Sequence, residues 1–146
     1  MPGRLVHGVV RALDAIIRPL GRSPDLPPHI LTGRRGEEEA YFYLRRLGYT
    51  MVARNWRSPH HSGEIDLIGW EGDVLCFVEV KTRTTREVKP AEAAVDREKQ
   101  REIASVARAF MNRMSSAPRR RYDILSVYLD CEPPEFTLFR NAFAVS

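Results

Sequence analysis

GEIDLIGWEGDVLCFVEVKTR, the sequence of residues 63–83, contains two largely apolar runs separated by Gly72-Asp73. A Gly-Asp pair between apolar runs is typical of a two-residue hairpin loop. The length of the loop sets the register of the two strands, and side chains alternate between the two faces of each strand. The sequence therefore predicts a β-hairpin with strands at residues 64–71 and 74–83.

Two carboxylates face each other across this hairpin. In the predicted register Asp66 lies opposite Glu79, and Lys81 shares their face. Opposed carboxylates destabilise a sheet unless another charge compensates them. A surface ion-pair ladder is the alternative, but Leu75 and Phe77 lie on the same face, so the charges are at least half buried, which is costly. We therefore favour a functional site, in which a divalent cation and the ammonium compensate the carboxylates.

This combination of side chains suits phosphodiester chemistry. Carboxylates are the hard oxygen ligands that magnesium and manganese prefer. The ammonium of Lys81 can hold a phosphate or a water molecule and can stabilise negative charge in a transition state. Carboxylates, one metal ion and one lysine are sufficient for metal-assisted hydrolysis of a phosphodiester.

The composition is that of a water-soluble globular domain with a basic balance. The 146 residues include 23 basic and 19 acidic side chains, so the net charge of +4 allows a polyanionic partner without requiring one. The two cysteines lack the spacing of a zinc site and fit a reducing, cytoplasmic setting. No apolar run approaches the ~20 residues that span a bilayer, and no secretory signal is recognisable.

The chain divides into three parts. Residues 1–21 have the apolar spacing of an amphipathic helix, residues 22–31 form a proline-rich linker, and residues 32–146 form the main domain. Three interpretations of the first helix stay open: docking on the main domain, a partly disordered extension, and binding to a membrane surface or a protein partner.

The main domain is predicted to be α/β, a mixed sheet flanked by two helices. The predicted order is helix, three strands, helix, two strands. The helices are expected at residues 36–47 and 90–114, and the strands at residues 49–56, 64–71, 74–83, 122–129 and 136–140.

These residues resemble the PD-(D/E)xK nucleases, which have a restriction-endonuclease-like core. Within that superfamily the chain is most similar to the YraN/UPF0102 group of small bacterial proteins, which are themselves similar to archaeal Holliday-junction resolvases. The resemblance covers residues 33–144, and the proline that precedes the aspartate in the superfamily pattern is Ile65 here. The matching residues are Gly36-Glu37, Ala40, Leu44, Gly48-Tyr49, Asn55, residues 63–68, residues 77–83, Lys99, Tyr122-Asp123 and Ala142-Phe143.

The resemblance assigns roles to four residues. It implies that Asp66 and Glu79 are metal ligands, that Lys81 is the catalytic lysine, and that Glu37 reaches the same Mg²⁺ or Mn²⁺ directly or through water. Only the resemblance selects Glu37, because glutamates in the first turns of a helix are commonly partners of the helix dipole. The implied activity is a DNA endonuclease, on branched or otherwise structured DNA, and junction enzymes of this kind are two-fold homodimers. A nucleic-acid-binding module of the same fold without catalysis is the alternative.

Other charged residues have two interpretations each. Arg83 and Lys99 are expected to contact nucleic-acid phosphates, although solvated charges explain them almost as well. The Arg119–Arg121 run is predicted to be a solvated turn, and binding to a phosphate backbone is the alternative. Asp123 either supports the site by contacting residues that hold the metal, without binding the metal itself, or pairs with one of these arginines. His60-His61 is expected to be a solvated loop, because no third metal ligand accompanies it.

Overall fold

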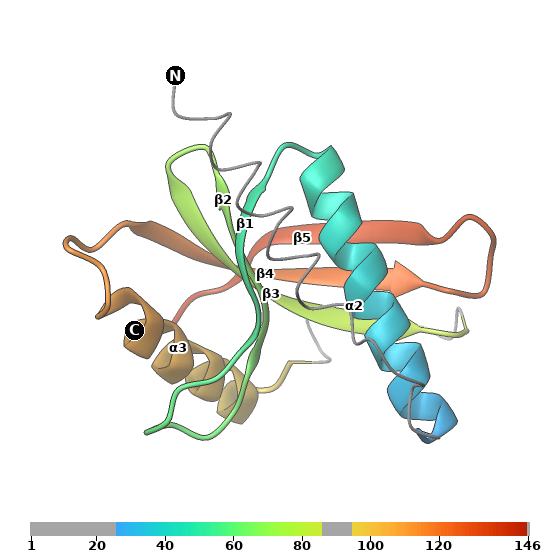
Figure 1. Cartoon of the computed structure of the whole chain (residues 1–146), viewed down its shortest axis with the longest axis horizontal. Helices are drawn as coiled ribbons and strands as arrows, with labels where there is room; N and C mark the ends of the chain where they lie inside the picture. The colour runs from blue at the N-terminus through green and yellow to red at the C-terminus, as the bar shows by residue number, and fades with distance from the viewer. Residues whose placement is uncertain (1–25, 86–94, 146) are drawn as a thin grey trace, which may run out of the picture.

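The computed structural model describes residues 26–85 and 95–145, which form a five-stranded sheet with a helix on each face (Figure 1). The strands lie side by side in chain order, β1-β2-β3-β4-β5. The predicted α/β fold and its element order are confirmed. None of the described helices is long and apolar enough to cross a bilayer. The elements are α2 (Pro28–Arg46), β1 (Thr50–Trp56), β2 (Ile65–Glu71), β3 (Val74–Arg83), α3 (Arg97–Met111), β4 (Arg119–Tyr128) and β5 (Glu135–Phe143).

The hairpin has the predicted register. Glu71 pairs with Val74 across the Gly72-Asp73 loop, and Gly72 has a positive φ of 60°. β3 and β4 are parallel and are connected through α3, whereas the other neighbouring strands are antiparallel. The sheet is therefore mixed, and β3 lies at its centre.

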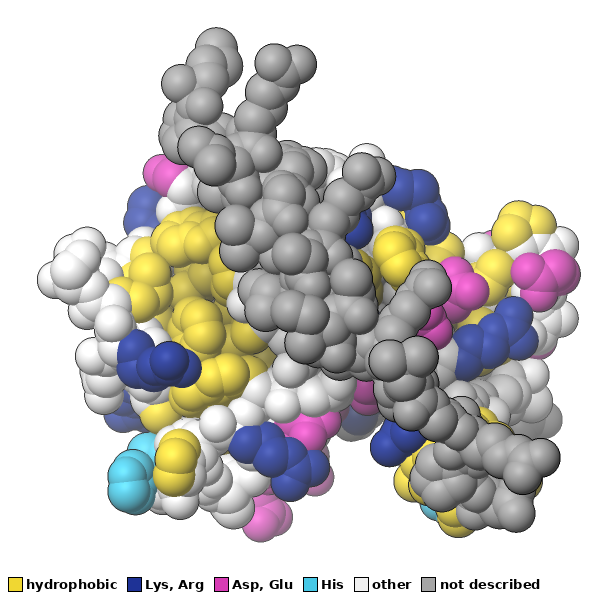
Figure 2. Space-filling view, in the orientation of Figure 1, with side chains coloured by type: hydrophobic (Ala, Val, Ile, Leu, Met, Phe, Trp, Pro, Cys, Tyr) yellow, Lys and Arg dark blue, Asp and Glu magenta, His cyan; other side chains and the backbone are white. Residues whose placement is uncertain are grey.

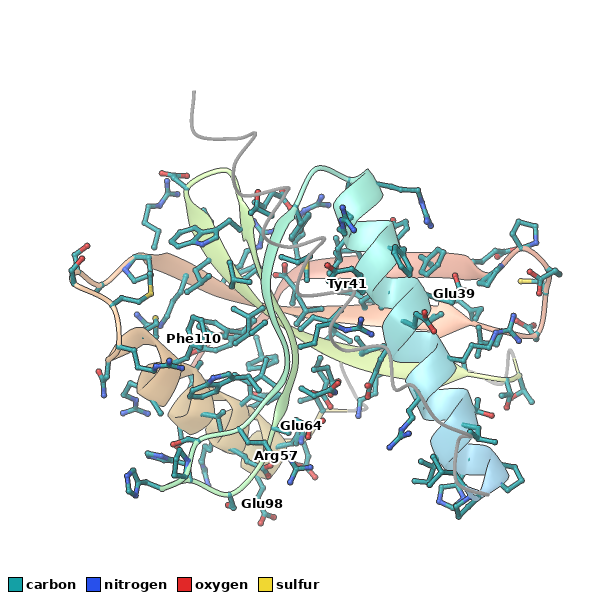
Figure 3. The ribbon with its side chains drawn as sticks, viewed as in Figure 1. Glu39, Tyr41, Arg57, Glu64, Glu98 and Phe110 are labelled. Atoms are coloured by element: carbon teal, nitrogen blue, oxygen red, sulfur yellow. The ribbon has the colours of Figure 1, made fainter. Side chains whose placement is uncertain are left out.

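Alternating side chains of β3 contribute to two separate cores. Leu75 and Phe77 belong to the core beneath α3, and Cys76 and Val78 belong to the core beneath α2. All four are essentially inaccessible to solvent. Burial raises the pKa of the Cys76 thiol to about 11. The α3-side core continues to the surface, where Figure 2 shows hydrophobic side chains in the region in which Figure 3 labels Phe110.

The first described helix begins earlier than predicted. α2 begins at Pro28 rather than at residue 36, so residues 28–31 are helical and do not belong to the linker predicted at residues 22–31. The cause is Pro28 itself, because a proline is well accommodated in the first turn of a helix, where its missing N–H costs nothing. The helix predicted at residues 1–21 lies outside the described residues.

Two further boundaries differ from the prediction. The helix predicted at residues 90–114 corresponds to α3, which begins at Arg97 and ends at Met111. Its N-cap is Asp96, whose carboxylate accepts a 2.9 Å hydrogen bond from the backbone N–H of Lys99. Residues Arg119–Arg121, predicted as a solvated turn, are the first three residues of β4 and pair with residues 74–76 of β3. A parallel partner distant in the sequence creates this strand, and the local sequence does not reveal it.

Candidate metal centre

β2 departs from regular strand geometry at Asp66. The paired register of β2 and β3 ends at Leu67 and Val78. In a regular strand Ile65 would share a face with Leu67, yet Ile65 lies in the α3-side core and Leu67 in the α2-side core. The chain therefore rotates at Asp66, and the Oδ2 atom of Asp66 accepts a 2.8 Å hydrogen bond from the backbone N–H of Val80. At the point where the two strands separate, the Asp66 carboxylate thus replaces a backbone carbonyl of β2 as the acceptor for the N–H of Val80.

Three carboxylates converge at this opening. Single carboxylate oxygens of Glu37, Glu64 and Asp66 all lie within 4.8 Å of one another. The side-chain amide of Asn55 donates hydrogen bonds of 3.0 Å to both Glu37 and Glu64. Asn55 has a positive φ of 46°, a backbone conformation that asparagine tolerates better than most residues. Its amide therefore links a carboxylate from α2 to one from the segment that precedes β2.

A glycine brings α2 close enough to contribute Glu37. Gly36 is buried in α2, and a Cβ atom at this position would collide with the side chain of Thr82 on β3. The absence of a side chain lets the helix lie directly against the strand. Glu37, the next residue, thereby comes within reach of Asp66. The close helix–strand contact is thus part of what builds the centre.

Glu79 and Lys81 complete the set of predicted residues. Glu79 is only 8% exposed, and its Oε1 atom lies 3.5 Å from the ammonium of Lys81. Glu79 is not one of the three carboxylates in the close group, but its charge raises the pKa of Asp66. The structure therefore brings all four residues, Glu37, Asp66, Glu79 and Lys81, to one region.

The acidic residues disfavour one another's charges. Burial and, after it, the charges of Glu79, Glu37 and Glu64 raise the pKa of Asp66 to about 8, although the hydrogen bond from Val80 works in the opposite direction. A fully ionised cluster therefore costs free energy in the absence of a cation. A divalent cation would remove this cost, because it neutralises the carboxylates together.

The sequence motifs assign no role to Glu64 or Asn55. Glu64 lies two residues before Asp66, a spacing that places both on one side of a strand, and this signal was present in the motif. Glu64 also forms a 2.7 Å ion pair with Arg57, and the two are labelled side by side in Figure 3. No sequence signal shows that Asn55 joins two carboxylates, because this contact depends on how α2 docks.

The two predicted phosphate contacts lie in different surroundings. Lys99, in the first turn of α3, is 3.5 Å from Glu102. Glu102 in turn lies against Gly63, the residue before Glu64, so this end of α3 adjoins the centre. The Nη2 atom of Arg83 is buried and has no hydrogen-bond partner among the described residues, so this part of the guanidinium does not face solvent.

Asp123 is bound to an arginine, one of the two alternatives that the sequence left open. Its carboxylate accepts hydrogen bonds of 2.9 and 3.1 Å from Nε of Arg121, and it also accepts one from the backbone N–H of Asn141. Arg121 further donates to Glu71 and to the hydroxyl of Tyr49. We call this group, with Arg140 on Glu71, the arginine network.

The histidine pair belongs to an exposed loop, as expected. Nδ1 of His61 lies 3.3 Å from the hydroxyl of Ser58. Among the residues that the structure describes, neither histidine belongs to a group of potential metal ligands.

Fold and centre together define a class of protein. It is an α/β protein with a mixed sheet, in which carboxylates and a lysine gather where the two strands of a central hairpin separate.

Comparison with known proteins identifies the family. The model of the uncharacterised protein family UPF0102 matches residues 36–127, a range that includes every residue of the centre. The UPF0102 protein of Koribacter versatilis (strain Ellin345) is 53% identical over 137 residues, which are 94% of this chain and 93% of that protein. The UPF0102 protein of Solibacter usitatus (strain Ellin6076) is 45% identical over 112 residues, 76% of this chain and 84% of that protein. The chain belongs to the UPF0102 family.

Proposed function

We propose that this protein is a Mg²⁺- or Mn²⁺-dependent nuclease that hydrolyses phosphodiester bonds in DNA. The observation that carries the proposal is the meeting of Glu37, Glu64 and Asp66 within 4.8 Å of one another, next to the buried Glu79 and its lysine. Such a concentration of acidic groups is unfavourable by itself and is commonly found at functional sites.

The ligand atoms fit a hard cation. Glu37, Glu64 and Asp66 would hold it, with Glu79 as a further ligand, and all of these offer carboxylate oxygens. Histidine and cysteine, which softer metals prefer, do not accompany them in the described part of the chain. When bound, such a cation makes hydroxide available near neutral pH and neutralises charge on the scissile phosphate.

The protein's own side chains supply the remaining functions. Lys81 is 27% exposed, so its ammonium can reach an incoming phosphate. The carboxylate with which it is paired, that of Glu79, stays buried. An ammonium in this place stabilises the negative charge that develops on the phosphate oxygens. Asn55 orients Glu37 and Glu64 through its amide and so holds two ligands in place.

The resemblance to junction resolvases motivates a narrower substrate, branched or otherwise structured DNA. A substrate with two-fold symmetry would be matched by a homodimer, and a DNA substrate would place the protein in the cytoplasm.

A protein partner of residues 1–21 is a separate expectation. It is tested by deleting that segment while leaving the domain intact.

The test is a cleavage assay on linear, nicked and branched DNA with Mg²⁺, with Mn²⁺ and with a chelator. We expect metal-dependent cleavage, and we expect Glu79→Gln and Lys81→Ala to lower its rate by about 100-fold or more. Glu37→Gln is compared with Glu38→Gln, because Glu38 is the neighbouring exposed glutamate in the same helix. Only the first should lose activity.

Two results would reject the proposal. One is intact DNA under all of these conditions. The other is cleavage that survives Lys81→Ala and Glu79→Gln unchanged, since a contaminating nuclease would then be responsible. Salt-sensitive DNA binding that needs no metal and survives Asp66→Asn, without cleavage, would support the non-catalytic binding module instead.

A further inference from the structure

Four arginines form a row on the molecule next to α3. Arg97, Arg101 and Arg108 are four and seven residues apart, so they project from one side of the helix, and Arg120 of β4 lies near Arg108. All four are exposed. We call these four residues the arginine row.

The arginine row borders a set of adjoining hollows. A hollow of about 330 Å³ is lined by Arg97 and Arg101 together with Val145. A second, of about 130 Å³, is lined by Arg108 and Arg120 and again by Val145. Arg120 and Val145 also line a third, of about 350 Å³. Since one residue is shared by all three, the arginines border three adjoining hollows between α3 and the end of β5.

No carboxylate compensates these charges in the part of the chain that the structure describes. None of the residues that line the three hollows is acidic, and no ion pair involves the arginine row. Nearby Arg119 and Arg121, in contrast, are paired with Asp73 and Asp123. Arginines gathered without acidic partners repel one another and attract a polyanion.

The row begins near the proposed metal centre. α3 begins at Arg97, and Glu102, little more than one turn later, lies against Gly63, which precedes Glu64. Arg97 and Arg108 are eleven positions apart in the sequence, which separates them by about 16 Å along the helix axis. This length matches about five base pairs of duplex DNA at 3.4 Å each.

We infer that the arginine row binds the phosphate backbone of a duplex arm that extends beyond the bond at the metal centre, an inference that rests on the proposed DNA substrate. Arginine suits this contact because its planar guanidinium can hold phosphate oxygens through two parallel hydrogen bonds. The hollows favour a convex backbone over a flat membrane surface. Such contacts position the nucleic acid without reading its sequence.

The experiment measures binding of a fluorescent duplex of about 24 base pairs by anisotropy, over a range of salt concentrations and with a chelator present so that cleavage cannot occur. Arg101→Gln combined with Arg108→Gln removes two charges from the row. Arg46→Gln combined with Arg113→Gln removes two exposed arginines elsewhere, from the end of α2 and from the turn that follows α3, where Arg113 lies over the Trp56 ring. Thermal unfolding of both variants verifies that they are folded.

We expect the slope of log affinity against log salt to become shallower by about 2 in the row variant and to stay unchanged in the control variant. Equal changes in both variants, no change in either, or no binding of DNA by the unaltered protein would overturn the inference. Binding to vesicles containing anionic lipid through the same arginines, without binding to DNA, would also overturn it. Because the readout is metal-free binding, loss of cleavage in Glu79→Gln tests the nuclease proposal separately.

Discussion

The two ends of β2 each carry a partly buried group of charges, and the two groups are balanced differently. In the arginine network, the carboxylates of Glu71 and Asp123 meet the guanidinium groups of Arg121 and Arg140. Burial acts to raise the pKa of Glu71, but hydrogen bonds from Tyr49, Arg121 and Arg140 outweigh burial and lower this pKa below its ordinary value. This group is neutralised within the protein itself.

At the other end, the metal centre has no such balance. Four carboxylates face Lys81 and the largely exposed Arg57, and the pKa of Asp66 is raised rather than lowered. The contrast separates a group of charges that is balanced within the protein from one whose mutual repulsion a bound cation would relieve.

The arginine network should be the more sensitive of the two to loss of a carboxylate. We expect Asp123→Ala to lower the free energy of unfolding by about 3 kcal/mol, because Arg121, only 17% exposed, would lose one of its two carboxylate partners and the backbone N–H of Asn141 would lose its acceptor. Urea unfolding measures the loss. Asp73→Ala is the control: its pair with Arg119 is at least 75% exposed, and its removal should cost less than about 1 kcal/mol. Equal costs would mean that burial does not distinguish the two pairs.

The contact of α2 with the sheet should come next in effect. Gly36→Ala would place a methyl group against Thr82, which should destabilise the protein by about 1–3 kcal/mol and weaken Mn²⁺ binding as Glu37 moves away. Gly33→Ala in the same helix has open space around it and should stabilise by about 0.5–1 kcal/mol. Calorimetry with and without Mn²⁺ measures both effects. Unchanged metal affinity in Gly36→Ala would show that this contact does not position the centre.

The metal centre should become more stable when a charge is removed. Asp66→Asn is expected to stabilise the metal-free protein by about 1–2 kcal/mol near pH 8 and to abolish stabilisation by Mn²⁺. The pKa of Asp66 is about 8 in the folded protein, against an ordinary value of 3.8, so the folded state holds the proton more tightly. Stability of the metal-free protein should therefore fall as the pH rises from about 4 to about 8 and level off above.

The same series of pH values supplies the control for this substitution. The fall in stability should be weaker in Asp66→Asn, and it should also weaken in the unaltered protein when Mn²⁺ is present. Identical profiles for the two proteins without metal would contradict the raised pKa of Asp66.

The smallest effect is expected at Asn55. Asn55→Gly keeps a residue that accepts the positive φ and removes only the amide that links Glu37 and Glu64. The metal-free protein should lose about 0.5–1 kcal/mol, because both hydrogen bonds are partly exposed to water. Thermal unfolding in the presence of Mn²⁺ should show a larger difference, since ligands that the amide no longer orients bind the cation less tightly. An equal or smaller difference with Mn²⁺ would show that the amide does not hold these ligands in place.

Local features of the sequence were enough to predict the central part of the fold. The turn at Gly72-Asp73 set the register of the hairpin, and the alternation of Leu75, Cys76, Phe77 and Val78 assigned its faces. The convergence of Asp66, Glu79 and Lys81 was expected from that register, although the pairing itself ends at Leu67 and Val78 and Asp66 accepts a hydrogen bond from the backbone N–H of Val80. These features involve residues close together in the chain, so the sequence alone contains them.

Features that depend on distant contacts were missed. The strand at Arg119–Arg121 exists because β3 supplies a parallel partner, and the amide of Asn55 reaches Glu37 only after α2 has docked. The rotation of β2 at Asp66 likewise depends on packing by both helices. The spacing of Glu64 and Asp66 in the motif therefore suggested a shared side but did not by itself show that Glu64 reaches the centre. Local pattern carries no information about such contacts.

The two cysteines differ in chemical reactivity. Cys76 is fully buried and its thiol has a raised pKa, so almost none of it is thiolate near neutral pH, whereas Cys131 is partly accessible. A maleimide dye should therefore attach to Cys131 alone. Its neighbour Glu132 pairs with Arg35 of α2 at 3.1 Å, immediately before Gly36. The natural sequence thus offers a spectroscopic probe beside the helix that contributes Glu37, and no engineered cysteine is needed to observe that helix when metal or DNA is added.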